Sequence, residues 1–405
     1  MKIFFLMAAA ALALPAQTDK AAGGEIRKKI KETLFVPDPA PKLAPVSHGK
    51  FKPEPGVIAE RVTYTTQFGL RVPAIVYRPE KSTGKLPALI VVNGHGGDKY
   101  TWYAFYSGMM YARAGAVVLT YDPIGEGERN SQRKSGTRAH DKLVQPAEMG
   151  RRMGGLMMTD VIQAVSYLSQ RPDVDPSRIG AMGYSMGSFV LSLACAVETR
   201  LRACVLVGGG NIDGPGEYWD RSKPMCQGIP YQSLQFLGDR PAVLYSLHPS
   251  TLIFNGLEDT VVDIPVHHTQ PFFEDMRQRT IRRRGAEDGV FEYRFEPGTS
   301  HRPYFVTRPV ALWLRSRLEF PNWREEDIRK MPTTHISEWA KERHAPMDAI
   351  YATEQREGGA LALGTGIPVP SRDELNAVPP AEWERNQEKY VLESWIKEAL
   401  SRVKP

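Results

Sequence analysis

Residues 179–190 read Ile-Gly-Ala-Met-Gly-Tyr-Ser-Met-Gly-Ser-Phe-Val, and this stretch decides the fold of the chain. An apolar strand pattern runs into Gly183-Tyr184-Ser185-Met186-Gly187, and a helical pattern follows. A strand, Gly-x-Ser-x-Gly and a helix in this order are typical of a nucleophile elbow, a strained turn that lifts a serine hydroxyl clear of a sheet. Only glycine fits two positions before and after that serine. The stretch predicts Ser185 as a nucleophile, but the pentapeptide alone is a weak signal and needs partners elsewhere.

Strand and helix patterns alternate along most of the chain. Continuous apolar runs, typical of strands covered on both faces, occur at residues 88–92, 203–207 and 251–254. Helical patterns occur at residues 102–114, 157–170, 272–284 and 310–318. This alternation predicts an α/β fold with a mostly parallel central sheet and helices on both faces. Reactive groups in such sheets gather in the loops at the carboxyl ends of the strands.

A serine hydroxyl needs a base, and the base needs an orienting acid. His301 follows the last predicted strand, and Asp259 follows the apolar strand at 251–254, so both belong to the same edge of the sheet as Ser185. Glu258 and Asp263 are close competitors for the acid position. The chain order Ser, Asp, His differs from the orders in chymotrypsin and subtilisin. We therefore predict a catalytic set of Ser185, His301 and Asp259, with the acid as the least certain member.

A glycine-rich turn follows the strand at 88–92 and reads Asn-Gly-His-Gly-Gly-Asp over residues 93–98. Glycines there let backbone N–H groups approach a developing oxyanion, where one good donor lowers the barrier by about 3 kcal/mol. We assign one donor to Gly97 or its neighbour and the other to Met186, directly after the nucleophile. His95 lies inside the turn, where a scaffolding hydrogen bond suits it better than the role of base.

The elbow, the glycine turn and the Ser, Asp, His order together resemble the α/β-hydrolase superfamily. Residues 122–129 and 171–180 resemble the branch that holds acetyl xylan esterases, cephalosporin-type deacetylases and dienelactone-hydrolase-like proteins. The resemblance spans residues 58–318 and implies a cofactor-free esterase whose acyl-enzyme forms on Ser185. It also implies that Glu128 and Arg129 brace the rim of the site. Ser188 departs from the family, whose members often carry glycine there, and the residues after 320 lie outside the pattern.

The ends of the chain suggest four segments. Lys2, an apolar run and Leu14-Pro15-Ala16 predict a signal peptide over residues 1–16, hence an exported protein. That run is too short to span a bilayer, so we expect no stable membrane insertion after cleavage. Residues 17–56 suggest an extended arm, 57–320 the catalytic domain, and 321–405 a helical extension that packs on the core or on a second subunit. The connection 209–249 is either a lid or a surface insertion with its own small core.

Charge and motifs exclude several other classes. The net charge is +6, but the most basic run, at residues 277–284, has no interleaved aromatics, so we expect a solvated helix face and no nucleic-acid partner. Three sparse cysteines make no disulfide framework. No Cys-x-x-Cys, His-Glu-x-x-His, phosphate-binding or dinucleotide-binding motif occurs, so we expect neither a metal nor a cofactor.

The sequence thus predicts an exported serine esterase acting on a small-molecule or carbohydrate ester; the carbohydrate acetate rests on resemblance alone. A prolyl-oligopeptidase-like serine peptidase is the alternative enzyme, and a catalytically silent binding protein is the alternative of another class. Natural substrate, acyl-chain preference and oligomeric state stay open.

Overall fold

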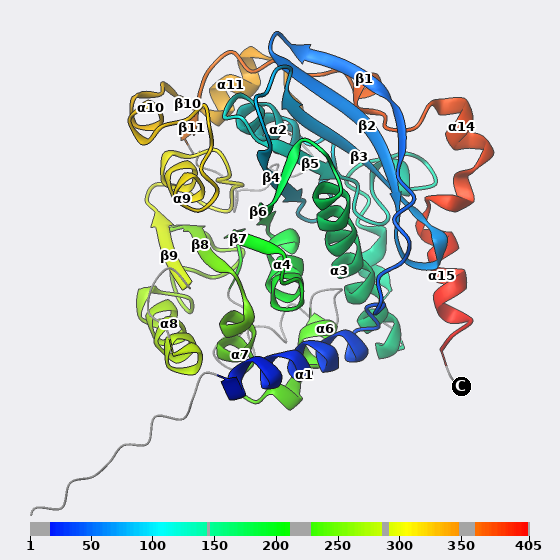
Figure 1. Ribbon diagram of the computed structural model, residues 1–405, viewed down its shortest axis with the longest axis vertical. Coiled ribbons are helices and arrows are strands. Elements are labelled where there is room, and N and C mark those ends of the chain that lie inside the picture. The colour runs from blue at the N-terminus through cyan, green and yellow to red at the C-terminus, as the bar shows by residue number, and fades with distance from the viewer. Residues whose placement is uncertain (1–16, 144–145, 211–227, 286–290, 348–360, 404–405) are drawn as a thin grey trace, which may run out of the picture.

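The structure is a computed structural model that describes residues 17–143, 146–210, 228–285, 291–347 and 361–403 (Figure 1). One nine-stranded sheet runs through it in the order β1-β2-β3-β5-β4-β6-β7-β8-β9. The first three pairings, from β1 to β5, are antiparallel, and the five from β5 to β9 are parallel. The strands are β1 Val46–Glu54, β2 Val57–Thr65, β3 Arg71–Pro79, β4 Leu86–Val92, β5 Val117–Tyr121, β6 Val174–Tyr184, β7 Leu201–Val207, β8 Ser250–Gly256 and β9 Phe291–Glu296. The predicted mostly parallel α/β sheet is confirmed.

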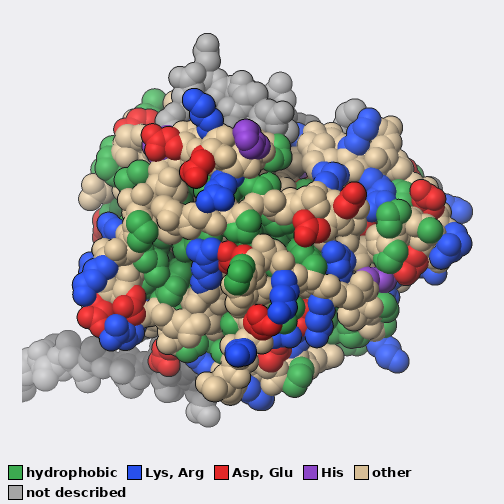
Figure 2. Space-filling model, turned by 90° about the horizontal axis from the view of Figure 1, so that it is seen from above, with side chains coloured by type: hydrophobic (Ala, Val, Ile, Leu, Met, Phe, Trp, Pro, Cys, Tyr) green, Lys and Arg blue, Asp and Glu red, His purple; other side chains and the backbone are tan. Residues whose placement is uncertain are grey.

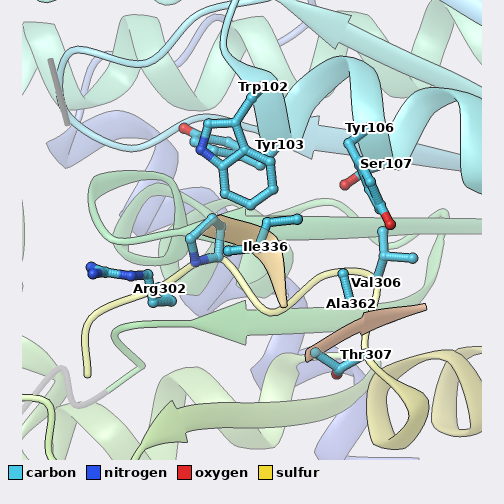
Figure 3. Close-up of a pocket in the computed structure, with 10 residues that line it drawn as sticks. Trp102, Tyr103, Tyr106, Ser107, Arg302, Val306, Thr307, Ile336 and Ala362 are labelled. Carbon is cyan, nitrogen blue, oxygen red and sulfur yellow. The ribbon is translucent and has the colours of Figure 1, made fainter. Parts of the chain in front are cut away.

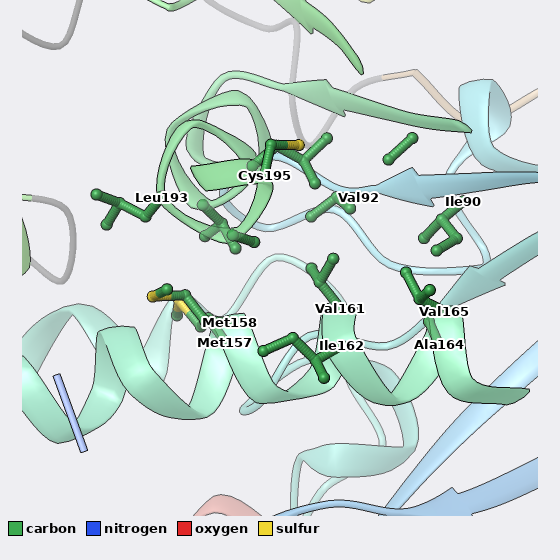
Figure 4. Close-up of a cluster of buried hydrophobic side chains, with 14 of the residues drawn as sticks. Ile90, Val92, Met157, Met158, Val161, Ile162, Ala164, Val165, Leu193 and Cys195 are labelled. Atoms are coloured by element: carbon green, nitrogen blue, oxygen red, sulfur yellow. The ribbon is translucent and has the colours of Figure 1, made fainter. Parts of the chain in front are cut away.

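Helices cover both faces of this sheet, because each strand of its centre is apolar on both sides. One face packs against α2 Trp102–Arg113 and α9 Arg308–Leu318. The other packs against α1 Gln17–Thr33, α3 Ala147–Ser169, α4 Met186–Val197, α7 Arg240–Leu247 and α8 Gln270–Arg284. Figure 4 shows the centre of that second core, where α3 side chains meet β4 and α4. The helices predicted at 102–114, 157–170, 272–284 and 310–318 are confirmed, although α3 begins ten residues earlier than expected.

The N-terminal arm is not extended, so this prediction is wrong. The segment begins with α1, which packs against α4. It ends with β1, which pairs with β2 as the edge strand of the sheet. The apolar side chains of Ile30 and Leu34 are fully buried, which anchors the end of α1 in the core. The sequence did not predict β1, because this edge strand is mostly exposed and carries polar residues along its length. The predicted signal peptide, residues 1–16, lies outside the described residues.

The C-terminal extension packs on the core, which is one of the two predicted arrangements. It contains α10 Glu325–Lys330, α11 Ile336–Glu342, α13 Arg372–Leu375, α14 Pro380–Arg385 and α15 Leu392–Leu400. A two-stranded sheet of β10 Thr333–His335 and β11 Leu361–Leu363 joins them, so the extension is not purely helical. Trp339 and Trp395 are buried in the two opposite cores, which shows that the extension wraps around both faces.

The connection between β7 and β8, residues 209–249, is described in part. Within the insertion the structure describes α6 Gly228–Gln232 and α7; residues 211–227, on which the lid prediction depends, lie outside the description. On the face seen in Figure 2, acidic and basic side chains are interspersed. No helix among the described residues is long and apolar enough to cross a membrane.

Candidate active site

The nucleophile elbow has the strained geometry that its sequence predicts. Ser185 lies between β6 and α4 with φ 52° and ψ −115°, a left-handed backbone that a serine adopts only under constraint. A Cβ on Gly183 would lie 2.4 Å from the carbonyl oxygen of Gly187, and one on Gly187 would lie 2.2 Å from that of Val92. Neither contact is sterically possible, so both positions require glycine.

The predicted base and acid are hydrogen bonded to each other. Nδ1 of His301, in the loop after β9, lies 2.7 Å from Oδ2 of Asp259, in the loop after β8, and both side chains are fully buried. Oδ1 of Asp259 accepts the N–H groups of Val261 and Val262 at 2.9 and 3.2 Å. Because the carboxylate is fixed by its own loop, it fixes the orientation of the imidazole.

The two competing carboxylates have other partners. Glu258 accepts the N–H groups of Gly298 and Thr299 at 3.1 and 2.6 Å, which ties the β8 loop to the loop that carries His301. Asp263 pairs with His267 four residues later. Of the three candidates, Asp259 is therefore the one that contacts His301.

Ser185 and His301 flank the same short segment at the carboxyl edge of the sheet. The Ser185 N–H donates to the carbonyl of Val207 at 2.8 Å, and a Cβ on the next residue, Gly208, would lie 2.8 Å from Cε1 of His301. The ring of Tyr184, directly before the nucleophile, lies 5.0 Å from the His301 ring, and its hydroxyl donates to the His301 carbonyl. Nε2 of His301 is buried and has no hydrogen-bond partner among the described residues. This nitrogen is thus available to accept a proton.

The glycine turn adjoins the elbow, and several of its N–H groups are engaged within the turn. Gly94 lies against Ser185, since a Cβ there would be 3.3 Å from the serine Cβ. The Gly97 N–H donates to the Gly94 carbonyl at 3.0 Å and closes the turn. The amides of Gly94 and Asp98 donate to Tyr103 and Thr101. Of the predicted donors, Gly97 or its neighbour, this geometry favours the neighbouring Gly96, while Met186 belongs to the first turn of α4, whose amides lack helical acceptors.

The His95 side chain pairs with a carboxylate of the loop after β5. Its Nε2 lies 2.8 Å from Oδ1 of Asp141, and its ring stacks on that of His140 at 5.5 Å. Burial lowers the pKa of His140 to about 4, so this imidazole is neutral near pH 7. His95, His140 and Asp141 are one of two groups of potential metal-ligating side chains among the described residues; Cys195, Cys204 and His248 form the other.

Glu128 and Arg129, which the family resemblance implies as braces of the rim, both have fully buried side chains. Glu128 pairs with Nζ of Lys99 at 2.8 Å and accepts the N–H groups of Ala377 and Val378 from the C-terminal extension. Lys99 also pairs with Asp122 at 2.5 Å. Burial is the main cause that raises the pKa of Asp122, to about 6, despite this lysine. Glu128 thus joins the extension to the loops behind the glycine turn.

Arg129 has a separate partner, Asp160 of α3, whose Oδ2 lies 2.5 Å from its Nη1. Lys99, Asp122 and Asp160 were not singled out as partners from the sequence, because single charged residues carry no local sign of burial. Lys99 and Asp122 stand 23 residues apart in the chain, and Arg129 and Asp160 stand 31 residues apart, so only the fold brings each pair together.

A small apolar pocket lies next to the His301 loop without including the three candidate groups (Figure 3). Trp102, Tyr103 and Tyr106 of α2 form one wall, and Arg302 and Val306 form the opposite one. Arg302 donates to the His301 carbonyl at 3.0 Å. The pocket therefore abuts the backbone of the candidate base.

Two family models match overlapping parts of the chain. Residues 41–207 match the acetyl xylan esterase family, and residues 146–323 match the prolyl oligopeptidase family. Both matches include the elbow, and the second also includes Asp259 and His301. Among solved structures, a methylesterase designated BT1017 superposes with a TM-score of 0.58 at 18% identity, covering 96% of this chain and 77% of its own. The chain has the α/β-hydrolase fold.

Further structures agree on the fold of this chain. A putative acetyl xylan esterase from Bacteroides fragilis superposes with a TM-score of 0.52 at 15% identity, covering 69% of this chain and 76% of that one. The acetyl xylan esterase from Paenibacillus sp. R4 has a TM-score of 0.51 at 17% identity, covering 75% and 100%. Likeness at these identities establishes the fold, and it is the fold that the resemblance in the sequence implies.

The curated relatives match this chain mostly over part of their length. The putative hydrolase YtaP of Bacillus subtilis is 28% identical over 37% of this chain and 55% of its own length. The thiohydrolase apmlB of Arthrinium phaeospermum is 25% identical over 56% of this chain and 72% of its own. The chain therefore spans about half the length of the first relative.

Proposed function

We propose that this protein is a hydrolase, namely a serine esterase that works through an acyl-enzyme on Ser185. The observation that carries the proposal is the buried hydrogen bond of 2.7 Å between His301 and Asp259, held at the sheet edge that carries the strained Ser185. A buried carboxylate that accepts from Nδ1 keeps the proton there and leaves Nε2 as the basic nitrogen.

The reaction follows from these positions. His301 Nε2 takes the proton of the Ser185 hydroxyl as its oxygen attacks the ester carbonyl. The Met186 N–H and an N–H of the glycine turn stabilise the oxyanion. His301 then passes its proton to the departing alcohol, and a water molecule, activated by the same imidazole, hydrolyses the acyl-enzyme.

For the substrate, we propose a short acyl ester, with acetyl groups on carbohydrate as the first candidate. Support comes from the acetyl xylan esterase match over residues 41–207 and from fold neighbours whose names describe esterases. An extracellular ester suits the export predicted from residues 1–16. A serine peptidase is the second candidate, and the prolyl oligopeptidase match over residues 146–323 favours it.

A substrate panel separates these candidates. The purified chain is assayed with p-nitrophenyl esters of increasing acyl length, with acetylated xylan, and with proline-containing p-nitroanilide peptides. We expect turnover of the acetate ester and a loss of about 10⁴-fold or more in kcat for Ser185→Ala. Ser188→Ala is the matched control, because the buried Ser188 hydroxyl has no hydrogen-bond partner among the described residues. Faster turnover of peptides than of esters would favour the peptidase, and turnover of neither would favour a binding scaffold.

A further inference from the structure

Three side chains with metal-ligating atoms meet where the glycine turn contacts the loop after β5. His95 belongs to the turn, and His140 and Asp141 belong to the short helix η3 Ala139–Lys142. One ligand atom from each lies within 4.8 Å of the other two. His140 is fully buried, whereas His95 and Asp141 are partly exposed, with 11% and 16% of their side-chain surface accessible. The cluster is therefore closed on one side and open to solvent on the other.

The imidazole of His140 presents a lone pair to the centre of this cluster. Its Nδ1 lies 3.1 Å from the Ile124 carbonyl oxygen, which only accepts, so Nδ1 carries the proton. In the neutral ring Nε2 is then an acceptor. That nitrogen is buried, has no hydrogen bond among the described residues, and lies 3.4 Å from Oδ1 of Asp141, which is also an acceptor. Two acceptors that face each other leave room for a cation.

The two oxygens of the Asp141 carboxylate have different partners. Arg138 pairs with Oδ2 at 2.6 Å. Oδ1 lies 2.8 Å from His95 Nε2 and 3.4 Å from His140 Nε2. One carboxylate oxygen is thus close to a nitrogen of both histidines.

We propose that His95, His140 and Asp141 form a binding site for a divalent transition metal of the Zn²⁺ type. Two imidazole nitrogens and one carboxylate oxygen suit Zn²⁺, whereas Mg²⁺ and Ca²⁺ need more oxygen ligands. The Ile124 carbonyl supplies the partner that a ligating histidine places on its other nitrogen, and Arg138 supplies one for the carboxylate. The exposed side of the cluster leaves a fourth position for water.

The second group of ligating atoms is less suited to a metal. Cys195, Cys204 and His248 are fully buried, and both nitrogens of His248 are engaged, with the Ser192 carbonyl at 2.7 Å and the Thr251 hydroxyl at 3.2 Å. A metal there would have to displace one of these bonds and leave a buried group unpaired. This group therefore serves as the control in the test.

A metal at the proposed site would join two loops that are already in contact. The Gly136 N–H donates to the Gly96 carbonyl at 3.1 Å, and His95 and Asp141 extend the same contact. The turn with His95 also carries an oxyanion donor of the proposed reaction. Bound metal would thus restrain that turn, although the proposed site does not depend on the esterase reaction. Sequence motifs gave no sign of it, because its ligands come from two separate loops.

The test is titration of chelator-treated full-length protein with ZnCl₂ by isothermal calorimetry. We expect one site per chain, weakened about 100-fold or more in His140→Asn and in Asp141→Asn, since each removes a ligand. Cys204→Ser and His267→Gln, outside the cluster, should bind as the unchanged protein does. Circular dichroism checks that each variant folds; if His140→Asn does not, the partly exposed His95→Gln replaces it.

Location of the metal completes the test. Anomalous diffraction at the zinc edge should place the ion between His95, His140 and Asp141. The proposal is overturned if the unchanged protein binds no Zn²⁺. It is equally overturned if folded His140→Asn and Asp141→Asn bind it with unchanged affinity, or if the anomalous peak lies at Cys195 and Cys204.

Discussion

Nδ1 of His301 lies 2.7 Å from Oδ2 of Asp259, although the two residues stand 42 positions apart in the chain. Both are fully buried, and Asp259 is braced by two amides of its own loop. The contact defines which ring nitrogen carries the proton, and on it depends the proposed role of His301 as base.

Asp259→Asn tests that relationship. The amide oxygen can still accept the Val261 and Val262 N–H groups, but its NH₂ group faces Nδ1 and favours the wrong imidazole tautomer. We expect kcat for ester hydrolysis to fall by about 10⁴-fold with little change in folding. Asp263→Asn, which removes a carboxylate paired with His267, is the matched control. Equal losses in the two variants, or none in Asp259→Asn, would contradict the assignment.

The elbow glycines give a prediction on stability. In Gly183→Ala the new Cβ would lie 2.4 Å from the Gly187 carbonyl oxygen, so the backbone must shift. We expect the free energy of unfolding to fall by about 3 kcal/mol. Gly24→Ala is the control, because this exposed glycine of α1 has nothing within 4 Å of a built Cβ; it should raise that free energy by about 0.5–1 kcal/mol. Urea unfolding measures both, and a tolerated Gly183→Ala would argue against the strained elbow.

The buried carboxylate of Glu128 should contribute to the stability of the folded chain. Glu128→Gln leaves Lys99 with Asp122 as its remaining carboxylate and weakens the contact with the Ala377 and Val378 amides. We expect a loss of about 3–5 kcal/mol in the free energy of unfolding.

The control for Glu128 is Glu326→Gln, which removes a charge from an exposed pair with Arg324 and should leave stability unchanged. Limited proteolysis offers a second measurement. Cleavage within residues 361–403 should become faster in Glu128→Gln only. Unchanged stability and unchanged cleavage would show that the extension is not held through Glu128.

Buried histidine predicts how stability depends on pH. Burial, with a smaller contribution from Arg284, lowers the pKa of His248 to about 4, against 6.5 for the free side chain. As pH falls from about 6.5 to 4, His248 therefore binds a proton in the unfolded chain but not in the folded chain. We expect about 3 kcal/mol of stability, fully present above pH 6.5, to be lost across this window.

Two variants check the source of this slope. His248→Gln removes the ionisable group while its amide can still donate to the Ser192 carbonyl, so urea unfolding from pH 7 to 4 should show a flatter dependence. His344→Gln, at an exposed position, should leave the dependence as it was. If the slope survives in His248→Gln, other groups must cause it.

How far the sequence predicts this molecule depends on the kind of residue. The central strands and the elbow were predictable because apolar runs and the Gly-x-Ser-x-Gly pattern are local signals. β1 was not, since its exposed polar residues gain order only by pairing with β2. The choice between Glu258 and Asp259 needed the loop geometry, because neighbouring carboxylates differ only in direction.

The partners of the buried charges could not be predicted from the sequence. The family resemblance implied that Glu128 and Arg129 brace the rim, but it did not indicate which residues they contact. They are buried because Lys99 and Asp160, distant in sequence, supply opposite charges. The same long-range assembly places His95 beside Asp141.

The most direct test of the central claim is covalent labelling. The purified chain is incubated with a fluorophosphonate probe, digested, and mapped by peptide mass spectrometry, with Ser185→Ala and Ser188→Ala in parallel. We expect one label, on Ser185, retained in Ser188→Ala and lost in Ser185→Ala. An unlabelled Ser185 beside a labelled control serine hydrolase would contradict a nucleophile at this elbow.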